Sequence, residues 1–157
     1  LYVLRAGPHT LLLECGLVQG TAEEELRNRE PFPIDVTGID AVVLSHSHID
    51  HSGRIPRLVK EGFEGPVYTH EASRALCAIM LPDSGYLNEK EVEWENRKRE
   101  KRRLPRIEPL YTQADAEACI GQFVGLEYET PTEILPGLTL TLYDAGHILG
   151  AAIVELT

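Results

Sequence analysis

The protein has 157 residues and a formal net charge of −10, because 25 acidic residues outnumber 15 basic ones. Hydrophobic residues make up 43% and charged residues 25%, which is ordinary for a globular domain with its own core. This composition excludes a disordered tail, a collagen-like fibre and a disulfide-rich mini-protein, and no apolar run is long enough to span a membrane.

Apolar runs near the start of the chain predict strands. Residues 1–6 and 10–14 flank the turn-forming pair Gly7-Pro8, and this arrangement predicts a β-hairpin. Residues 41–44 are continuously apolar, which is typical of a strand buried on both faces of a sheet. The chain passes directly from this strand into the sequence SHSHIDHSG.

Helices are predicted where apolar residues recur at a spacing of three and four. One helix follows Gly53 and ends near Gly62, and residues 66–69 form the next strand. A second apolar helical face surrounds Ile79. We expect this helix to end at Pro82, because proline has no N–H group to continue the hydrogen-bonding pattern.

A long polar stretch follows at residues 86–103. It is helical in pattern but too charged for a core element, so we expect it to project from the molecule or to cover an edge. Thr112 and Asp115 resemble a capping box with Asp in place of Glu, which predicts a helix that runs on to Phe123.

Two strands are predicted near the end of the chain. Residues 138–143 alternate Leu with Thr and Tyr, as expected of a strand with one solvated face, and residues 151–156 form the last strand. The sequence DAGHILG lies between them. Since strands and helices interleave throughout, the predicted class is α/β or α+β with layered sheets.

Metal-binding side chains gather in two loops that each follow a predicted strand. Residues at i and i+2 of an extended backbone point the same way, so two histidines of the first loop can bind one ion. Imidazole and carboxylate are ligands that zinc prefers, and three imidazoles with a carboxylate in one short loop have no use in packing. The predicted metal ligands are His46, His48, Asp50 and His51 in the first loop and His147 in the second.

Residues 97–103 read RKREKRR and are strongly basic. The net charge of −10 excludes a protein that coats nucleic acid by bulk attraction. The run is therefore either a solvated helix face, as charge runs usually are, or a local phosphate-binding strip. The candidate polyanion contacts of this strip are Arg97, Lys98, Arg99, Lys101, Arg102 and Arg103.

At the histidine motif the sequence resembles the metallo-β-lactamase superfamily, whose H-x-H-x-D-H signature matches residues 46–51. The nearer resemblance is to its β-CASP branch of RNA-processing nucleases, relatives of RNase J and of the cleavage-and-polyadenylation endonuclease. The supporting stretches are LLLECGLVQG at 11–20, SHSHIDHSGRIPRL at 45–58, PLYT at 109–112 and AGHILGA at 145–151.

The resemblance implies an αββα sandwich with two divalent ions, zinc or alternatively manganese, at the exposed strand ends. It implies that His46, His48 and His147 bind one ion and that Asp50 and His51 bind the other. Asp50 would also orient the attacking hydroxide. The family usually has Asp where this chain has Glu14, which is one methylene longer and is a candidate support for the ligand loop.

The resemblance also predicts that residues 1–157 are the N-terminal part of a metallo-β-lactamase-like domain. On this resemblance, residues 1–157 lack three parts of the family's domain. These are the first loop, the β-CASP insertion and the C-terminal part, which carries a metal-bridging Asp. We therefore expect the 157 residues alone to be inactive. The full-length protein is a candidate homodimer.

The predicted function is metal-dependent hydrolysis of single-stranded RNA, endonucleolytic or exonucleolytic, by a hydroxide that two metal ions activate. One alternative is a metallo-hydrolase of small esters, thioesters or lactones, and another is an inactive subunit of an RNA-processing complex. The three scattered cysteines form no C-x-x-C pair, which favours a reduced, cytoplasmic location.

Overall fold

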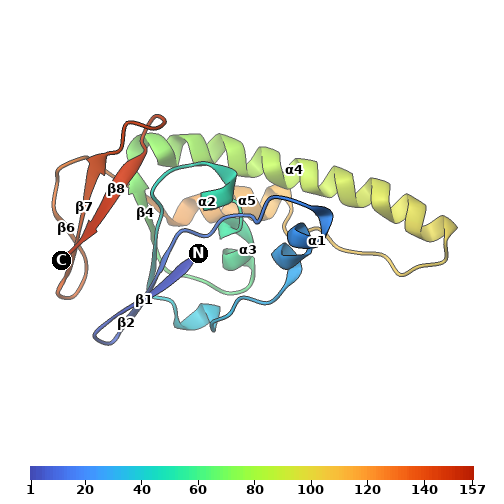
Figure 1. The fold of residues 1–157 in the computed structure, drawn as a ribbon, viewed down its shortest axis with the longest axis horizontal. Helices are drawn as coiled ribbons and strands as arrows, with labels where there is room; N and C mark the ends of the chain where they lie inside the picture. Colours follow the sequence, from blue (N-terminus) through green and yellow to red (C-terminus); the bar gives the residue numbers. More distant parts are fainter.

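The computed structural model describes all of residues 1–157 and shows two β-sheets beside a layer of helices (Figure 1). The larger sheet has the strand order β1-β2-β3-β4-β5, and the smaller has the order β6-β7-β8. The strands are β1 (Tyr2–Ala6), β2 (His9–Leu13), β3 (Ala41–Val43), β4 (Val67–His70), β5 (Phe123–Leu126), β6 (Thr132–Leu135), β7 (Leu138–Asp144) and β8 (Ala152–Leu156).

The helices differ greatly in length, from single turns to the long α4 that crosses one side of the molecule (Figure 1). The α-helices are α1 (Ala22–Glu25), α2 (Ile49–Ser52), α3 (Ile55–Lys60), α4 (Glu71–Lys101) and α5 (Gln113–Cys119). The 3₁₀ turns are η1 (Leu26–Arg29), η2 (Val36–Gly38) and η3 (Ile120–Gln122).

The larger sheet places its middle strands between two apolar layers. β1 and β2 form the predicted antiparallel hairpin, and β2, β3, β4 and β5 are parallel. All three residues of β3 are fully buried, which explains why its sequence shows no polar alternation. A parallel sheet ends all its strands at one edge, so the loops after β2 and β3 lie together.

Adjacent residues of the larger sheet belong to different cores because successive side chains point to opposite faces. Leu12 and Val42 join the core shared with the helices, whereas Leu11 and Val43 join the core shared with β6, β7 and β8. The layers are therefore helices, larger sheet and smaller sheet, which confirms the predicted layered α/β class. The outer face of the smaller sheet is open, and Ile153 there is 59% exposed.

The predicted helix end at Pro82 is wrong, because α4 continues through this residue. Proline removes one backbone hydrogen bond and crowds the preceding turn. The packing of Leu81 and Gly85, buried on either side of it, outweighs that local preference. The distal part of α4 extends beyond the other elements, as its polar sequence predicts (Figure 1).

The helix predicted to run from Thr112 to Phe123 is also too long. Its start is correct, since the side chains and backbones of Thr112 and Asp115 form both bonds of a capping box. The helix ends at Cys119, and Phe123 begins β5, which pairs with the free edge of β4. Neither β5 nor β6 was predicted, because four-residue strands carry too little alternation to be recognised.

Two further sequence-based expectations concern the whole chain. All three cysteines are free thiols in buried positions. No helix combines the length and the apolar character that a bilayer crossing requires.

Candidate metal centre

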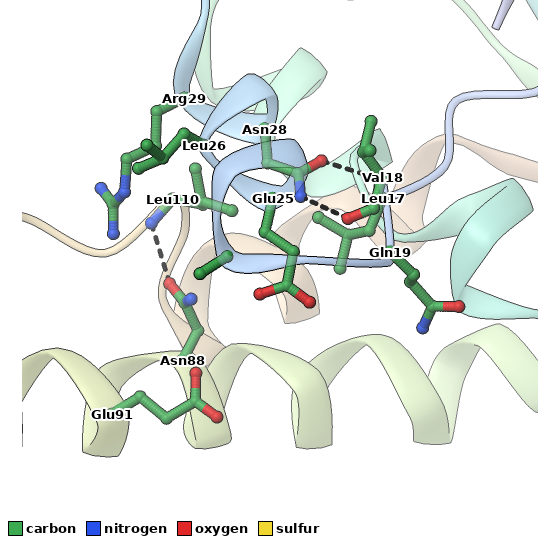
Figure 2. A pocket seen from close by; sticks show the side chains of 11 residues that line it. Leu17, Val18, Gln19, Glu25, Leu26, Asn28, Arg29, Asn88, Glu91 and Leu110 are labelled. Atoms are coloured by element: carbon green, nitrogen blue, oxygen red, sulfur yellow. Dashed lines mark hydrogen bonds between the residues drawn. The ribbon is translucent and has the colours of Figure 1, made fainter.

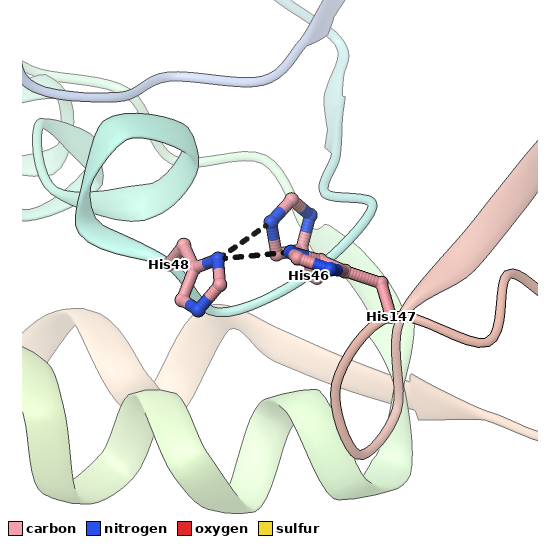
Figure 3. A group of neighbouring side chains, drawn as sticks. All are labelled: His46, His48 and His147. Atoms are coloured by element: carbon pink, nitrogen blue, oxygen red, sulfur yellow. Dashed lines mark hydrogen bonds between the residues drawn. The ribbon is translucent and has the colours of Figure 1, made fainter.

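Three histidine rings converge where the loop after β3 meets the turn between β7 and β8 (Figure 3). Nε2 of His46 lies 3.1 Å from Nδ1 of His48, and Nε2 of His147 lies 3.3 Å from the same Nδ1. Two nitrogens bound tetrahedrally to one zinc at about 2.0–2.1 Å are about 3.4 Å apart. Two of the three nitrogen pairs therefore have the spacing that one shared ion requires, and all three donor atoms lie within 4.8 Å of one another.

The loop that carries His46 and His48 is held by hydrogen bonds from its own residues and from the loop after β2. The hydroxyl of Ser52 donates to the carbonyls of Ser47 and His48. The backbone N–H of Cys15 donates to the His51 carbonyl at 2.8 Å. This loop is fixed by the fold before any ligand is bound.

Gly16 marks the closest approach of the two loops. A Cβ atom at this position would lie 1.6 Å from the carbonyl oxygen of Asp50, so no other residue type fits without moving the backbone. The glycine brings the loop after β2 directly against the histidine motif.

His46 is oriented and kept neutral by its surroundings. Its Nδ1 lies 2.8 Å from the hydroxyl of Ser45, which leaves Nε2 facing the other two rings. Burial, together with the neighbouring histidines, lowers the pKa of His46 to about 4. At neutral pH the ring is therefore uncharged, which is the form that binds metal.

Glu14, in the loop after β2, contacts two residues of the histidine loop. Its Oε1 accepts a hydrogen bond of 3.0 Å from the backbone N–H of Ser45, and its Oε2 lies 3.1 Å from Nδ1 of His51. Its φ of 62° lies in the left-handed region, which costs a residue with a side chain about 1–2 kcal/mol. The longer side chain of Glu14 thus reaches the ligand loop.

Asp50 and His51 lie beside the three converging histidines. The ring of His51 is 4.0 Å from that of His46, centroid to centroid, and its Nε2 is 3.6 Å from Oδ2 of Asp50. Glu14 faces the opposite nitrogen of His51, as carboxylates commonly do behind metal-binding histidines. The structure therefore offers an imidazole and a carboxylate as a second pair of donors.

The turn that presents His147 is fixed from two directions. The hydroxyl of Ser73, on the first turn of α4, donates to the Gly150 carbonyl at 2.8 Å. The hydroxyl of Tyr128 donates to the Ala151 carbonyl at 2.9 Å. Gly150 has a φ of 79°, and a Cβ there would lie 2.5 Å from the backbone nitrogen of Ser73.

These supporting residues were not identified from the sequence. Ser45 could have been found, because it directly precedes His46 and a ligand's neighbour often orients it. Ser73 and Tyr128 are distant from His147 along the chain and have ordinary sequence surroundings, so only the fold reveals their contacts.

Comparison with known proteins agrees with this geometry. The family model described as the metallo-beta-lactamase superfamily matches residues 1–146. The chain belongs to the metallo-beta-lactamase superfamily. This finding confirms the resemblance drawn from residues 46–51, and with it the expected layered fold.

Curated members of the superfamily that resemble this chain include a ribonuclease of Thermus thermophilus, 37% identical over 98% of this chain and 31% of its own length. The transcription termination factor FttA of Methanocaldococcus jannaschii is 32% identical over 93% of this chain and 21% of its own length. The chain thus spans about a third or less of these relatives.

Solved structures of the superfamily show the same fold at low identity. The metallo-beta-lactamase fold protein YhfI of Bacillus subtilis has a TM-score of 0.54 at 17% identity, covering 99% of this chain and 48% of that one. The subclass B3 metallo-beta-lactamase BJP-1 of Bradyrhizobium japonicum has a TM-score of 0.54 at 19% identity, covering 99% and 49%.

A groove runs from the histidine loop along α4. One cavity of about 430 Å³ begins at Ile49, beside His48, and shares Leu17 and Gln19 with a second of about 390 Å³ (Figure 2). Glu25 and Glu91 line the second cavity. Arg29 lines the same cavity, so its wall carries side chains of both charges.

The predicted basic strip does not lie at the metal centre. It occupies the distal end of α4, whereas Ser73 at the proximal end contacts the His147 turn. At about 1.5 Å per residue, Arg97 is about 36 Å along the helix from Ser73.

Proposed function

We propose that this protein is part of a metal-dependent RNA hydrolase. The observation that carries the proposal is the convergence of His46, His48 and His147 at the spacing of one shared ion, with Asp50 and His51 beside them. The substrate class is supported by the ribonuclease that is 37% identical over almost the whole chain.

The residues fit two divalent ions, which we propose to be zinc or alternatively manganese. Bound there, the ions would supply a water that is acidic enough to react at neutral pH and would offset phosphate charge. The proposed donors are His46 Nε2, His48 Nδ1 and His147 Nε2 for one ion, and the side chains of Asp50 and His51 for the other.

The chain's own residues then orient and expose the reacting groups. Glu14 Oε2 lies 3.1 Å from Nδ1 of His51, which leaves Nε2 of that ring available, and Glu14 Oε1 accepts a hydrogen bond from the backbone N–H of Ser45. The Asp50 side chain is 53% exposed and can accept a hydrogen bond from the attacking water, which orients it. His147 is exposed as well, so the site is accessible to a polymer such as single-stranded RNA.

The decisive experiment changes two ligands of different ions. We expect His48→Ala and His51→Ala in the full-length protein each to lower turnover of a labelled single-stranded RNA at least about 100-fold, because each removes a metal donor. His9→Ala is the matched control, since His9 lies in the β1–β2 hairpin away from the site.

Undiminished RNA cleavage by both variants would contradict the proposal. Turnover of a thioester or lactone without turnover of RNA would assign the site to a small-substrate hydrolase. Tight metal binding without hydrolysis of any of these substrates would indicate a non-catalytic subunit.

The free, buried cysteines support a reducing, cytoplasmic environment for the protein.

A further inference from the structure

The distal end of α4 and the segment after it carry basic residues without acidic partners. Elsewhere the exposed cations are commonly paired, for example Lys90 with Glu93 and Arg74 with Glu71. None of the cations in residues 97–106 has a carboxylate within 4.0 Å, although the protein is acidic as a whole. These cations are Arg97, Lys98, Arg99, Lys101, Arg102, Arg103 and Arg106.

An exposed tryptophan belongs to the same surface. Trp94, Arg97, Lys98 and Lys101 have the spacing i, i+3, i+4 and i+7, so they share one face of α4. The Trp94 ring is 59% exposed, and the Lys98 ammonium lies 2.9 Å from its centroid. A large exposed aromatic ring beside unpaired cations offers both stacking and charge to one ligand.

This end of the helix is held in place rather than frayed. The Asn96 side chain donates to the Ile107 carbonyl and accepts from the Ile107 N–H, both at 2.8 Å. The Arg99 side chain donates to the Pro105 carbonyl at 2.7 Å. These hydrogen bonds hold the segment after α4 against the distal end of the helix. Arg106 belongs to this segment.

We propose that the distal end of α4 is a binding site for single-stranded RNA, in which a base stacks on Trp94 and the surrounding cations contact phosphates. Phosphate binding needs Lys and Arg, and an aromatic face accepts any unpaired base. The acidic remainder of the molecule repels a polyanion, so the attraction is confined to this end. The choice of RNA as the polymer rests on the proposed function.

The proposed RNA site is remote from the metal centre, so the length of an RNA decides whether it can contact both. Trp94 is 21 residues from Ser73 along α4, or about 32 Å at about 1.5 Å per residue. That distance corresponds to about nine nucleotides of a helically stacked strand, at a rise of about 3.4 Å per nucleotide. An RNA of only a few nucleotides therefore contacts one site at a time.

The test is direct binding of a labelled RNA of about 20 nucleotides, which is longer than the span between the two sites, measured by fluorescence anisotropy in EDTA so that no hydrolysis occurs. We expect Trp94→Ala to weaken binding about tenfold. We expect the triple variant Arg97→Gln, Lys101→Gln and Arg106→Gln to lower the slope of log K against log salt by about 2. Arg5→Gln, an exposed cation on β1, is the matched control and should bind normally.

A second measurement identifies the position of contact. RNA should quench the tryptophan fluorescence of the protein, and the quenching should be lost in Trp94→Phe. Affinities of the Trp94 and triple variants equal to that of the control would overturn the inference, as would equal competition by polyglutamate. RNA cleavage with no Trp94 effect would refute this site alone, whereas Trp94-dependent binding without cleavage would refute the proposed function alone.

Discussion

Glu14 shows how one residue can reconcile backbone strain with a chemical role. Its left-handed backbone is unfavourable for a residue with a side chain, and such strain persists only where the surroundings determine it. Here the two carboxylate oxygens contact Ser45 and His51. The strain therefore accompanies a position from which one side chain contacts both the backbone of the histidine loop and His51, a proposed metal donor.

We predict that Glu14→Gln weakens metal binding at the Asp50 and His51 pair about 10- to 100-fold, because a neutral amide no longer polarises the imidazole of His51. The change keeps an oxygen that can accept from Ser45. Isothermal titration with zinc measures the effect, and Glu64→Gln, an exposed surface change, is the control. An unaltered second binding step would show that Glu14 has no part in ligand orientation.

The proposed ligands could be found from the sequence because the motif at residues 46–51 concentrates donor chemistry in one short segment. The nitrogen that each ring presents was not predictable. It depends on Ser45 behind His46 and Glu14 behind His51, and the second of these contacts crosses between two loops. Sequence spacing does not reveal such contacts.

At the scale of elements, α4 shows that packing can override the local preference of residues that disfavour a helix. Pro82 should end a helix but does not, and Gly85 should weaken one yet is retained in its interior. Gly85 is buried where α4 crosses the start of α5, and a Cβ there would lie 2.7 Å from the Thr112 carbonyl oxygen. The sequence pattern alone contains neither fact.

We predict that Gly85→Ala lowers the free energy of unfolding by up to about 2 kcal/mol. The gain of about 1 kcal/mol in helix propensity is smaller than the cost of separating two closely packed helices, about 1–3 kcal/mol. Urea denaturation followed by circular dichroism measures the difference. Gly121→Ala, whose Cβ would meet no atom within 4 Å, should be close to neutral, and a stabilised Gly85→Ala would contradict the packing argument.

At the scale of the whole molecule, the layered class was predictable because interleaved strands and helices have few arrangements. The division into two cores was not, since it depends on which face each strand residue occupies. Cys15, Cys77 and Cys119 all belong to the core between the helices and the larger sheet. They therefore report whether that core is intact.

We predict that the three thiols do not react with Ellman's reagent in the native protein at pH 8. Burial raises the pKa of each to about 12, so the reactive thiolate is scarce as well as shielded. In urea all three should react together with the loss of structure. Rapid modification of any one thiol under native conditions would show that the core opens locally.

The convergence of three imidazoles from two sheets has a mechanical consequence. His48 and His147 are 99 residues apart in sequence, and each leaves a different sheet. A cation held by both would tether the sandwich much as a disulfide tethers a loop, and for a loop of about 100 residues chain entropy assigns such a tether about 4.7 kcal/mol. The ion that serves catalysis would then also act as a reversible cross-link between the two sheets.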